Sequence, residues 1–203
     1  CEFVAGHITP VSGNFIFDNK KINQFGIKEF MSMGIAYIPE DRNIDGLIGD
    51  MSIQENAVLS ELKNPRICSK FGFLKAKECE MYAKNICDKY DVRMQSVSQP
   101  ARLLSGGNVQ KLLIGRWLER NPNVIIACQP TRGLDEGAIA AVHTMLIKAK
   151  LEGKAVLFVT EDLDELLLIS DKISVMYNGS LTNPRKAKNL EKRELGLMMT
   201  GTI

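Results

Sequence analysis

The clearest chemical pattern in this sequence is a serine and two glycines that run directly into an amphipathic segment, LSGGNVQK at residues 104–111. Glycines allow backbone N–H groups to approach a phosphate closely, Ser105 adds a hydroxyl donor, and the N-terminus of a helix adds its positive dipole end. Gln110 and Lys111 fall in the first turn, where they could also face an anion. The alternative is a plain N-cap, in which Ser105 only begins a core helix. The residues alone leave both interpretations open.

Helical patterns surround this stretch. The apolar residues after the glycines recur at the spacing of one helix face, and Asn121-Pro122 ends that pattern. Upstream, Ser52 with Glu55 three positions later forms a capping box ahead of a helix that runs to about Leu62. A further stripe predicts a buried helix face and not a cofactor site; it consists of Cys79, Tyr82, Ala83, Ile86, Cys87 and Tyr90. We therefore expect residues 51 to about 120 to be helical.

Apolar runs on both sides of the helical region predict a parallel α/β core. Residues 35–38 read as a short strand, and the unbroken apolar runs at 124–128 and 155–159 predict buried strands. Further along, helices are expected at 138–152 and 163–170, and another strand at 173–177. Shorter signals predict a hairpin over residues 13–22, a hairpin turn at Asn178-Gly179, and a helix end with Gly6 as its C-cap.

Composition excludes several classes of function. The formal charge of +2 is too small to indicate binding to nucleic acid or to an anionic membrane surface. No apolar run approaches the ~20 residues of a membrane span, so a membrane role would come through a partner. The five cysteines form no CxxC pair and there are only two histidines. These counts exclude a zinc site and a disulfide framework, and they favour a reducing cytosol.

The run LSGGNVQ resembles the LSGGxxQ signature of the ATP-binding cassette (ABC) family, and the order of segments around it fits that family along the whole chain. The resemblance implies an α/β P-loop NTPase core that lacks its P-loop segment, with an inserted helical subdomain. It divides the chain into core residues 1–50, a helical signature subdomain at 51–121 and further core at 122–203. In this family, the signature closes over the γ-phosphate of ATP held on the P-loop of a second cassette. The resemblance thus assigns ATP binding in trans to Ser105, Gly106, Gly107, Asn108 and Gln110.

A second motif is PEDR at residues 39–42. On its own, its acidic pair would be a solvated turn. In ABC cassettes, the strand before this position leads into the Q-loop, and Glu40 occupies the place of the Q-loop glutamine. Together with the terminal run LGLMMTG at 195–201, the motif resembles the second cassette of importers for simple sugars and nucleosides. The resemblance therefore implies that Glu40, Asp41 and Arg42, in a loop that extends to Gly49, contact the permease.

The residues that would hydrolyse ATP depart from the family pattern. A P-loop enzyme needs a phosphate-binding loop, a carboxylate for Mg²⁺ and a group that positions water, but this sequence has no GxxxxGK[ST] motif. The resemblance places that motif just upstream of residues 1–6, so we expect the chain to begin inside the helix that follows the P-loop.

The Walker B strand departs as well. Cys128 and Gln129 stand where the family has aspartate and the catalytic glutamate. A thiol is a poor ligand for Mg²⁺, and glutamine cannot act as a general base. On local grounds alone, the two residues could be an ordinary strand end. Beyond them, Asp135 stands at the position of the D-loop aspartate, and Glu161 replaces the switch histidine.

These features predict the C-terminal, hydrolysis-impaired cassette of an ABC importer for a sugar or nucleoside. ATP and Mg²⁺ would be bound in the assembled complex and not tightly by this chain alone, which we expect to be inactive. The implied partners are a first cassette, permease subunits and, indirectly, an extracellular solute-binding protein, with no nucleic acid. The implied location is peripheral, at the cytoplasmic face of the cell membrane.

Two alternatives stay open. One is a soluble ABC-type ATPase that acts on DNA or ribosomes. ABC-type proteins of DNA repair carry long coiled coils or zinc modules, and those that bind ribosomes carry hydrolytic carboxylates and basic arms. The sequence shows none of these features between or around the motifs. The other alternative is an active ATPase in which Gln129 works with a neighbouring acid such as Asp162.

Overall fold

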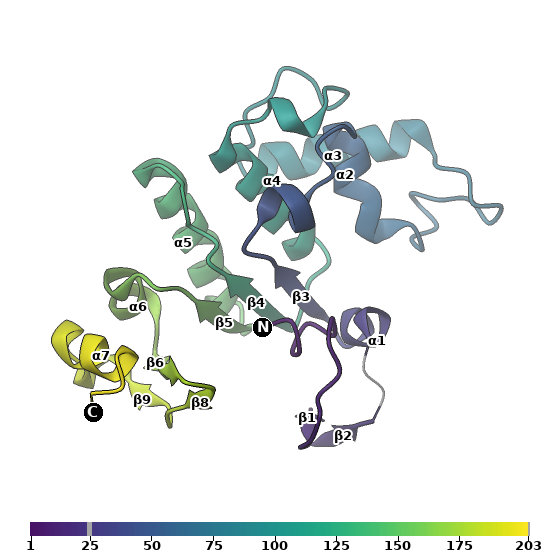
Figure 1. The fold of residues 1–203 in the computed structure, drawn as a ribbon. Coiled ribbons are helices and arrows are strands. Elements are labelled where there is room, and N and C mark those ends of the chain that lie inside the picture. The colour runs from purple at the N-terminus through teal and green to yellow at the C-terminus, as the bar shows by residue number, and fades with distance from the viewer. Residues whose placement is uncertain (24–25, 203) are drawn as a thin grey trace. The chain divides into compact units, whose positions relative to one another are not determined.

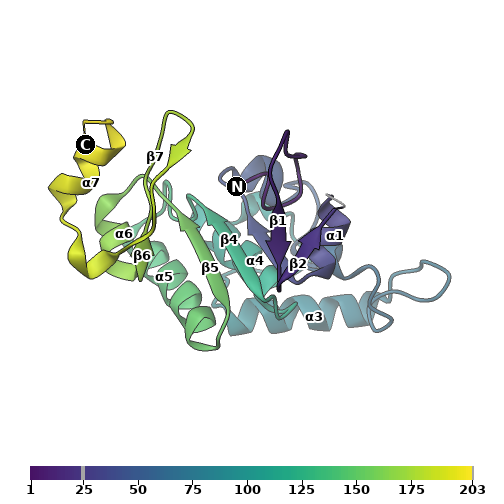
Figure 2. The same cartoon turned by 90° about the horizontal axis from the view of Figure 1, so that it is seen from below.

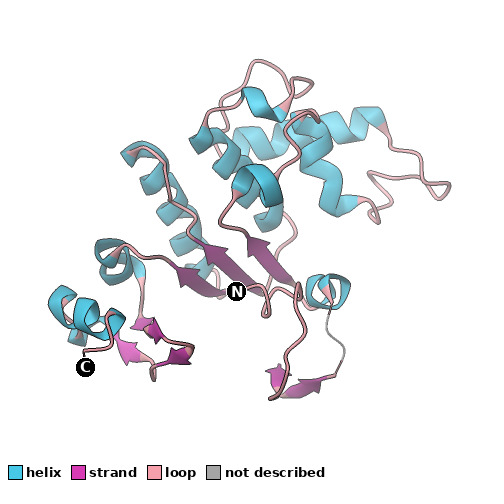
Figure 3. Cartoon of the chain, in the orientation of Figure 1, coloured by secondary structure: helices cyan, strands magenta, loops and turns pink. Residues whose placement is uncertain are grey.

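The structure of this chain is a computed structural model that describes residues 1–23 and 26–202. These residues group into two compact units, residues 1–157 and residues 158–203. The first unit combines a parallel sheet with helices, and the second contains short strands with the helices α6 and α7 (Figures 1 and 3). The predicted subdivision at residues 50 and 121 falls within the first unit and stays a prediction.

The centre of the first unit is a sheet with the strand order β3-β4-β5. Its strands, which are labelled in Figure 1, are β3 (Ile35–Ile38), β4 (Val124–Cys128) and β5 (Ala155–Val159). β3 and β4 run parallel, with Ile35 opposite Val124 and Ile38 opposite Ala127. Most residues of these two strands are buried, as their apolar runs predicted.

Different parts of the chain cover β3 and β4. Alternate residues of a strand point to opposite faces of the sheet. Ile35, Ile126 and Cys128 pack in one cluster with Ala5 and with Phe30 of α1. The helix α4 contacts β3 and packs against α5, so both the sheet and a neighbouring helix position it. The three helices are α1 (Ile27–Ser32), α4 (Gly106–Leu118) and α5 (Glu136–Leu151).

The prediction that residues 155–159 form a buried strand was correct in type and wrong in burial. Burial alternates along β5, where Ala155, Leu157 and Val159 are exposed and the two residues between them are half-buried. Leu157 is 44% exposed. β5 stands at the end of the strand order, and within the described residues only one of its faces is covered. An unbroken apolar run cannot reveal this difference between a central strand and an end strand.

The helical part of the first unit contains the predicted helices, but residues 62–75 and 90–100, which were expected to be helical, are loops. Ser52 and Glu55 form the predicted capping box, with the Glu55 carboxylate accepting from the Ser52 N–H at 2.8 Å. The stripe predicted for the next helix is buried at Cys79, Ala83, Ile86 and Cys87. The elements of this part that precede α4 are η1 (Arg42–Gly46), α2 (Ile53–Val58), η2 (Leu59–Glu61), α3 (Ala76–Lys89) and η3 (Ala101–Leu103).

The N-terminal segment contains the predicted helix end. The His7 N–H donates to the Glu2 carbonyl at 2.8 Å, and the Gly6 N–H donates to the Phe3 carbonyl at 3.0 Å. This pair of bonds, with Gly6 at φ +82°, is a Schellman motif. The predicted hairpin follows as β1 (Phe15–Phe17) and β2 (Lys20–Ile22), joined by two residues in the left-handed region, Asp18 and Asn19.

The second unit corrects one predicted strand. Residues 173–177 do not form one strand; they are divided between β6 and β7, which pair antiparallel with β9 and β8. The break falls at Val175, whose N–H donates to the hydroxyl of Thr182 at 2.9 Å in place of a strand carbonyl. The predicted turn at Asn178-Gly179 joins β7 to β8. The elements are α6 (Leu163–Ile169), β6 (Lys172–Ile173), β7 (Met176–Tyr177), β8 (Ser180–Leu181), β9 (Arg185–Lys186), η4 (Ala187–Asn189) and α7 (Lys192–Met199).

Candidate functional site

The predicted signature lies at the N-terminus of α4, with Ser105 as the N-cap. The Ser105 hydroxyl oxygen accepts hydrogen bonds from the backbone N–H of Asn108 at 3.4 Å and from its side-chain amide at 2.9 Å. Because the oxygen accepts in both bonds, the Ser105 hydroxyl keeps its proton to donate to an anion. The N–H groups of Gly106 and Gly107 occupy the first helical positions, where no intrahelical acceptor exists. This end of α4 therefore offers several donors to one bound phosphate.

Asn108 connects the signature to the loop that precedes it. Its side-chain oxygen accepts from the backbone N–H of Arg93 at 2.8 Å, while its amide donates to Ser105. Both ends of the Asn108 amide are thus engaged within the domain. We assign Asn108 a role in fixing the orientation of Ser105.

The two signature glycines have different steric surroundings. A Cβ atom on Gly107 would lie 2.8 Å from the Cβ of Ala138 in α5, which is closer than two carbon atoms can approach. Gly107 therefore permits α4 and α5 to pack, whatever else it binds. A Cβ on Gly106 would meet only the end of the Arg42 guanidinium, at 3.1 Å. That flexible group can move, so Gly106 is the position at which ligand approach alone explains the glycine.

Gln110 and Lys111 do not lie beside the other predicted donors on the surface. The Gln110 side chain is 1% exposed and belongs to the buried side of α4. The Lys111 ammonium pairs with the Asp91 carboxylate at 2.6 Å and also donates to the Asp91 carbonyl. The structure thus brings together Ser105, Gly106 and Gly107 and separates them from Gln110 and Lys111.

The predicted Q-loop segment meets the segment after β4. The Arg42 guanidinium donates to the carbonyl oxygen of Arg132 at 2.8 Å, and the Arg132 guanidinium forms an ion pair with Glu40. Asp41 accepts from the N–H groups of Asn43 and Ile44 and so caps η1. The Nε atom of Arg42 is buried without a hydrogen-bond partner in the part of the chain that the structure describes. Arg42 thus lies between the signature and the predicted D-loop.

A buried polar network holds the segment that follows Arg42, and sequence reasoning missed it. Arg116 of α4 is 6% exposed and donates to the carbonyl oxygens of Gly46 at 2.9 Å and Asn56 at 3.2 Å. Burial lowers the pKa of the Arg116 guanidinium to about 10. The Asn56 side chain in turn exchanges two hydrogen bonds with the backbone of Ile48, at 2.8 and 2.9 Å. An arginine in an amphipathic helix gives no sequence signal for such a role.

The end of β4 contains the residues predicted at the Walker B positions. The side chains of Tyr37 and Cys128 interact at this end of the strand. Burial, together with this thiol, raises the pKa of Tyr37 to about 12, and burial raises the pKa of Cys128 above its ordinary value. A buried, protonated thiol is a poor ligand for Mg²⁺, which prefers carboxylate and other oxygen ligands. Cys128 therefore does not fit Mg²⁺, which the resemblance predicts at this position.

Gln129 and Asp135 have distinct backbone roles. Gln129 follows β4 with φ +47°, in the left-handed region that residues other than glycine adopt infrequently. Its carbonyl accepts from the Arg132 N–H at 3.1 Å. Asp135 is the N-cap of α5, and its carboxylate accepts from the Ala138 N–H at 2.8 Å. The D-loop position thus begins the helix on which Gly107 packs.

Glu161 and Asp162 lie in the second unit, which is described by itself. Glu161 is exposed. Asp162 is the N-cap of α6 and accepts from the N–H groups of Asp164 and Glu165. Both hydrogen bonds that the Asp162 carboxylate accepts therefore stabilise the start of α6.

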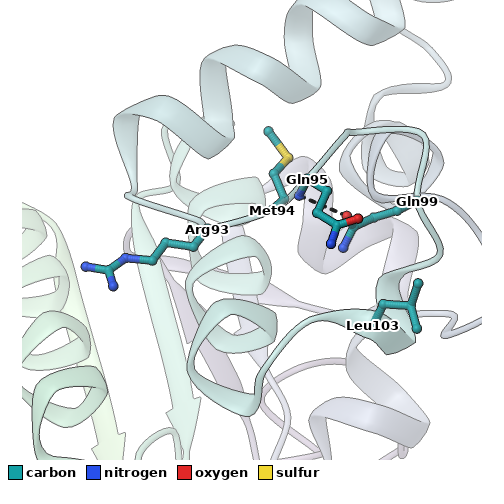
Figure 4. A pocket seen from close by; sticks show the side chains of 5 residues that line it. All are labelled: Arg93, Met94, Gln95, Gln99 and Leu103. Atoms are coloured by element: carbon teal, nitrogen blue, oxygen red, sulfur yellow. Dashed lines mark hydrogen bonds between the residues drawn. The ribbon is translucent and has the colours of Figure 1, made fainter.

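A surface pocket of about 400 Å³ lies in the loop before the signature. Figure 4 shows Gln95 beside Gln99, whose side-chain oxygen accepts from the Gln95 N–H at 3.0 Å, while Arg93 points away from both. The same loop is bonded to the segment after η1, because the Arg102 N–H donates to the Gly49 carbonyl at 3.0 Å. The pocket is lined by Arg93, Met94, Gln95, Gln99 and Leu103.

Two further properties concern metals and membranes. Among residues 1–23 and 26–202, no group of three or more histidine, cysteine or acidic side chains is arranged to hold a metal ion. No helix in the described part of the chain combines the length and the apolar character that crossing a membrane requires.

Comparison with known proteins relates this geometry to a family. Residues 1–132 match the ABC transporter family. The chain is 40% identical over 198 residues to the nucleoside import ATP-binding protein NupA of Lactococcus lactis subsp. cremoris. It is also 40% identical over 202 residues to the guanosine import ATP-binding protein NupO of Bacillus subtilis. The alignments cover 98% and 99% of this chain but 39% of each relative, so the chain spans about two fifths of the length of the curated relatives it matches.

Solved structures show the same fold. A dimeric post-hydrolysis state of the ATP-binding cassette MJ0796, bound to ADP and Pi, superposes with a TM-score of 0.72 and 24% identity over 92% of this chain and 78% of that chain. A nucleotide-free cassette from an ABC transporter gives a TM-score of 0.75 and 22% identity, over 97% of this chain and 81% of that chain. At these identities, the likeness shows the fold alone, which is that of an ABC cassette.

Proposed function

This chain belongs to the ABC transporter family, and we propose that it is the ATP-binding cassette of an importer for nucleosides or simple sugars. We further propose that it donates its signature to ATP held by a partner cassette. The observation that carries this proposal is the N-terminus of α4, where the exposed Ser105 keeps a hydroxyl proton to donate. With the N–H groups of Gly106 and Gly107, it forms a donor set that fits a γ-phosphate. Gln110, which is buried, would support the helix from within.

An impaired hydrolytic site in this chain is the second part of the proposal. Cys128 offers a protonated thiol to a position that requires an oxygen ligand, and Gln129 has no proton-accepting group of suitable pKa. Glu161 would place a negative charge beside a phosphate that an imidazole would attract. This chain would therefore contribute little to hydrolysis at its own site. ATP and Mg²⁺ would be held by the assembled complex.

The segment from Glu40 to Gly49 is the proposed contact with the permease. It presents exposed apolar side chains at Ile44 (79% exposed) and Ile48 (48% exposed). Arg116 and Asn56 tie this segment to α4, and Arg42 ties it to the predicted D-loop. A permease movement that displaces residues 40–49 would thus be transmitted to the signature through the contacts of Arg116, Asn56 and Arg42. Asp135, at the N-terminus of α5, would couple the two ATP sites, each of which is formed by the P-loop of one cassette and the signature of the other.

The names of the relatives support the proposed solute class and partners. The two relatives at 40% identity are named for the import of nucleosides and guanosine, and a ribose import protein of Rhizobium etli, RbsA 3, is 36% identical over 178 residues, which is 88% of this chain and 34% of that protein. We therefore propose a first cassette, permease subunits and an external solute-binding protein as partners. The location would be peripheral, at the cytoplasmic face of the membrane.

Solute uptake by whole cells tests this proposal. Cells that lack the gene are supplied with the wild-type gene or with a Ser105→Arg variant, and uptake of radiolabelled nucleosides and ribose is measured. We expect the wild type, but not Ser105→Arg, to restore uptake of one solute class, because arginine would fill the phosphate position. Ser52→Ala, which loses an N-cap of the same kind outside the signature, should also restore it. Equal uptake with and without the wild-type gene, for every solute, would contradict the importer assignment.

A further inference from the structure

A loop that carries two exposed phenylalanines projects from the helical part of the first unit. It comprises residues 64–75, between η2 and α3, and is called here the aromatic loop. Phe71 is 88% exposed, Phe73 is 74% exposed and Leu74 is 48% exposed. In both Figure 1 and Figure 2, the loop extends outward beyond the N-terminus of α3. An exposed apolar patch that is contiguous can mark a surface that binds a partner.

The aromatic loop is an ordered structure that holds these rings outward. The Ser69 N–H donates to the Phe73 carbonyl at 2.8 Å, and the Phe73 N–H donates to the Ser69 hydroxyl at 3.1 Å. At its base, the Lys75 N–H donates to the Ile67 carbonyl at 2.9 Å. Ile67 is 2% exposed and packs in a core cluster with Val58 and Cys79. The loop is therefore anchored on its inner side while its tip has apolar side chains in solvent.

Positive charge predominates in the aromatic loop and the residues that flank it, although the exposed Glu78 follows them directly. Residues 62–77 contain five basic residues and no acidic residue, whereas the whole chain has a formal charge of only +2. The nearest acidic residue before the loop, Glu61, is engaged by Arg120 at 2.7 Å. All five basic side chains are exposed, and they are Lys63, Arg66, Lys70, Lys75 and Lys77. The charge of the whole chain conceals this local excess.

We propose that the aromatic loop binds the surface of an anionic lipid bilayer directly. Phe71 and Phe73 enter the boundary between headgroups and acyl chains, and the surrounding lysines lie among the lipid phosphates. Two features favour lipid over a protein partner. The apolar residues lie at a projecting tip, which a fluid surface can surround without a matching groove. The five exposed basic residues in and beside the loop complement the negative potential of such a membrane.

This lipid contact goes beyond the proposed function. It uses residues on a different segment from the signature, and it needs neither ATP nor a permease. The composition of the chain led us to expect membrane contact only through a partner. The proposed lipid contact would be direct. In the cell, the contact would orient the helical part of the cassette against the inner leaflet.

Vesicle co-sedimentation of the full-length protein, purified without its permease, tests the proposal. The vesicles contain phosphatidylcholine alone or phosphatidylcholine with about one third phosphatidylglycerol. We expect binding to the anionic vesicles only, and a loss of about tenfold or more in the double variant Phe71→Ser/Phe73→Ser, because both apolar anchors are removed. The matched control Val11→Ser/Leu151→Ser removes two apolar side chains that are 105% and 79% exposed elsewhere, and it should bind as the wild type does.

The charge contribution is measured in the same assay. Lys70→Gln and Lys77→Gln should each weaken binding by about fivefold at low salt, and added salt should weaken binding of the wild type. Lys186→Gln and Lys188→Gln, which remove the same charge from exposed positions in the second unit, should leave binding unchanged. Equal binding to neutral and anionic vesicles would overturn the proposal.

Insertion of the tip has a spectroscopic readout. In a Phe71→Trp variant, anionic vesicles should shift the added tryptophan emission to shorter wavelength, and brominated acyl chains should quench it. Vesicle binding by Phe71→Ser/Phe73→Ser at wild-type strength would contradict the proposal. A second contradicting result is that this variant still binds vesicles but no longer associates with the permease in detergent. The tip would then contact a protein and not lipid. Because Ser105→Arg should leave vesicle binding unchanged, failure of the importer proposal is distinguishable from failure of this one.

Discussion

The Arg42 guanidinium donates a hydrogen bond to the carbonyl oxygen of Arg132, 90 residues further along the chain, at 2.8 Å. Arg42 also lies beside Gly106 at the start of α4. One side chain thus contacts the segment after β4 and the signature, and it belongs to the loop proposed to contact the permease. Arg42 thus connects motifs that the sequence analysis identified separately.

Replacing Arg42 should reduce the coupling of ATP hydrolysis to the permease. Arg42→Ala removes a charged hydrogen bond, which is worth roughly 1.5–3 kcal/mol, so we expect permease-stimulated ATPase activity to fall by about tenfold or more. Arg132→Ala keeps the accepting carbonyl and removes only the exposed ion pair with Glu40, so its effect should stay below about threefold. The measurement is ATPase activity of the assembled transporter. An equal effect of the two variants would contradict this role of Arg42.

The signature glycines should differ in their effect on stability. Gly107→Ala forces a methyl group against Ala138, and overpacking of this kind costs about 1–3 kcal/mol of unfolding free energy. Gly106→Ala displaces only the Arg42 guanidinium and should change stability by less than about 1 kcal/mol. Urea unfolding of both variants provides the comparison. The packing explanation for Gly107 would be wrong if Gly107→Ala were as stable as the wild type.

The buried network around Arg116 should contribute strongly to stability. Arg116→Met leaves the carbonyl groups of Gly46 and Asn56 without their donor, and each buried unsatisfied group costs about 1–3 kcal/mol. We expect a total loss of roughly 2–5 kcal/mol in urea unfolding. The control is Arg102→Met, which breaks an exposed ion pair with Asp50 and should cost less than about 1 kcal/mol. Similar losses in both variants would show that Arg116 does not have this role.

Alkaline pH should destabilise the chain through its buried acids. The pKa of Tyr37 and that of Tyr82 are each raised by burial from 10.0 to about 12, and burial raises the pKa of Cys87 from 9.0 to about 11. The unfolded chain loses these protons at lower pH than the folded chain does. Their contribution to stability is therefore complete below about pH 9 and is lost progressively towards pH 12.

Urea unfolding at pH 8, 9.5 and 11 measures this loss, and phenolate absorbance reports which tyrosines have ionised. Cys87→Ala should reduce the part of the loss that begins near pH 9, because it removes the group of lowest pKa among the three. A free energy of unfolding that stayed constant over this range would contradict the prediction.

Much of the fold could be predicted because local signals agreed with the final packing. The capping box at Ser52, the helix end at Gly6 and the turn at Asn178-Gly179 depend on backbone conformations that a few residues determine. The strands β3 and β4 were likewise predicted from apolar runs of strand length, whereas their pairing with each other is a finding of the structure. The exposed face of β5 could not be predicted, because it depends on which elements lie beside the strand.

The start of the helix that carries the candidate site was predicted, but the contacts of its side chains were not. The motif at 104–111 identified the start of α4, yet the burial of Gln110 and the pairing of Lys111 with Asp91 depend on contacts with distant segments. The same is true of Arg42 with Arg132. Side chains such as Arg116, whose partners are backbone carbonyls, have no partner residue type that a sequence pattern could reveal.

The most direct test of the central claim compares ATP hydrolysis by Ser105→Arg and Gln129→Ala variants of the full-length protein assembled with its permease. Ser52→Ala serves as the control for loss of an N-cap, which costs about 1 kcal/mol of stability. If this chain donates its signature and does not hydrolyse ATP itself, Ser105→Arg abolishes turnover while Gln129→Ala and Ser52→Ala retain most of it. Loss of hydrolysis in Gln129→Ala with turnover preserved in Ser105→Arg would make this cassette the working catalyst and would contradict the account.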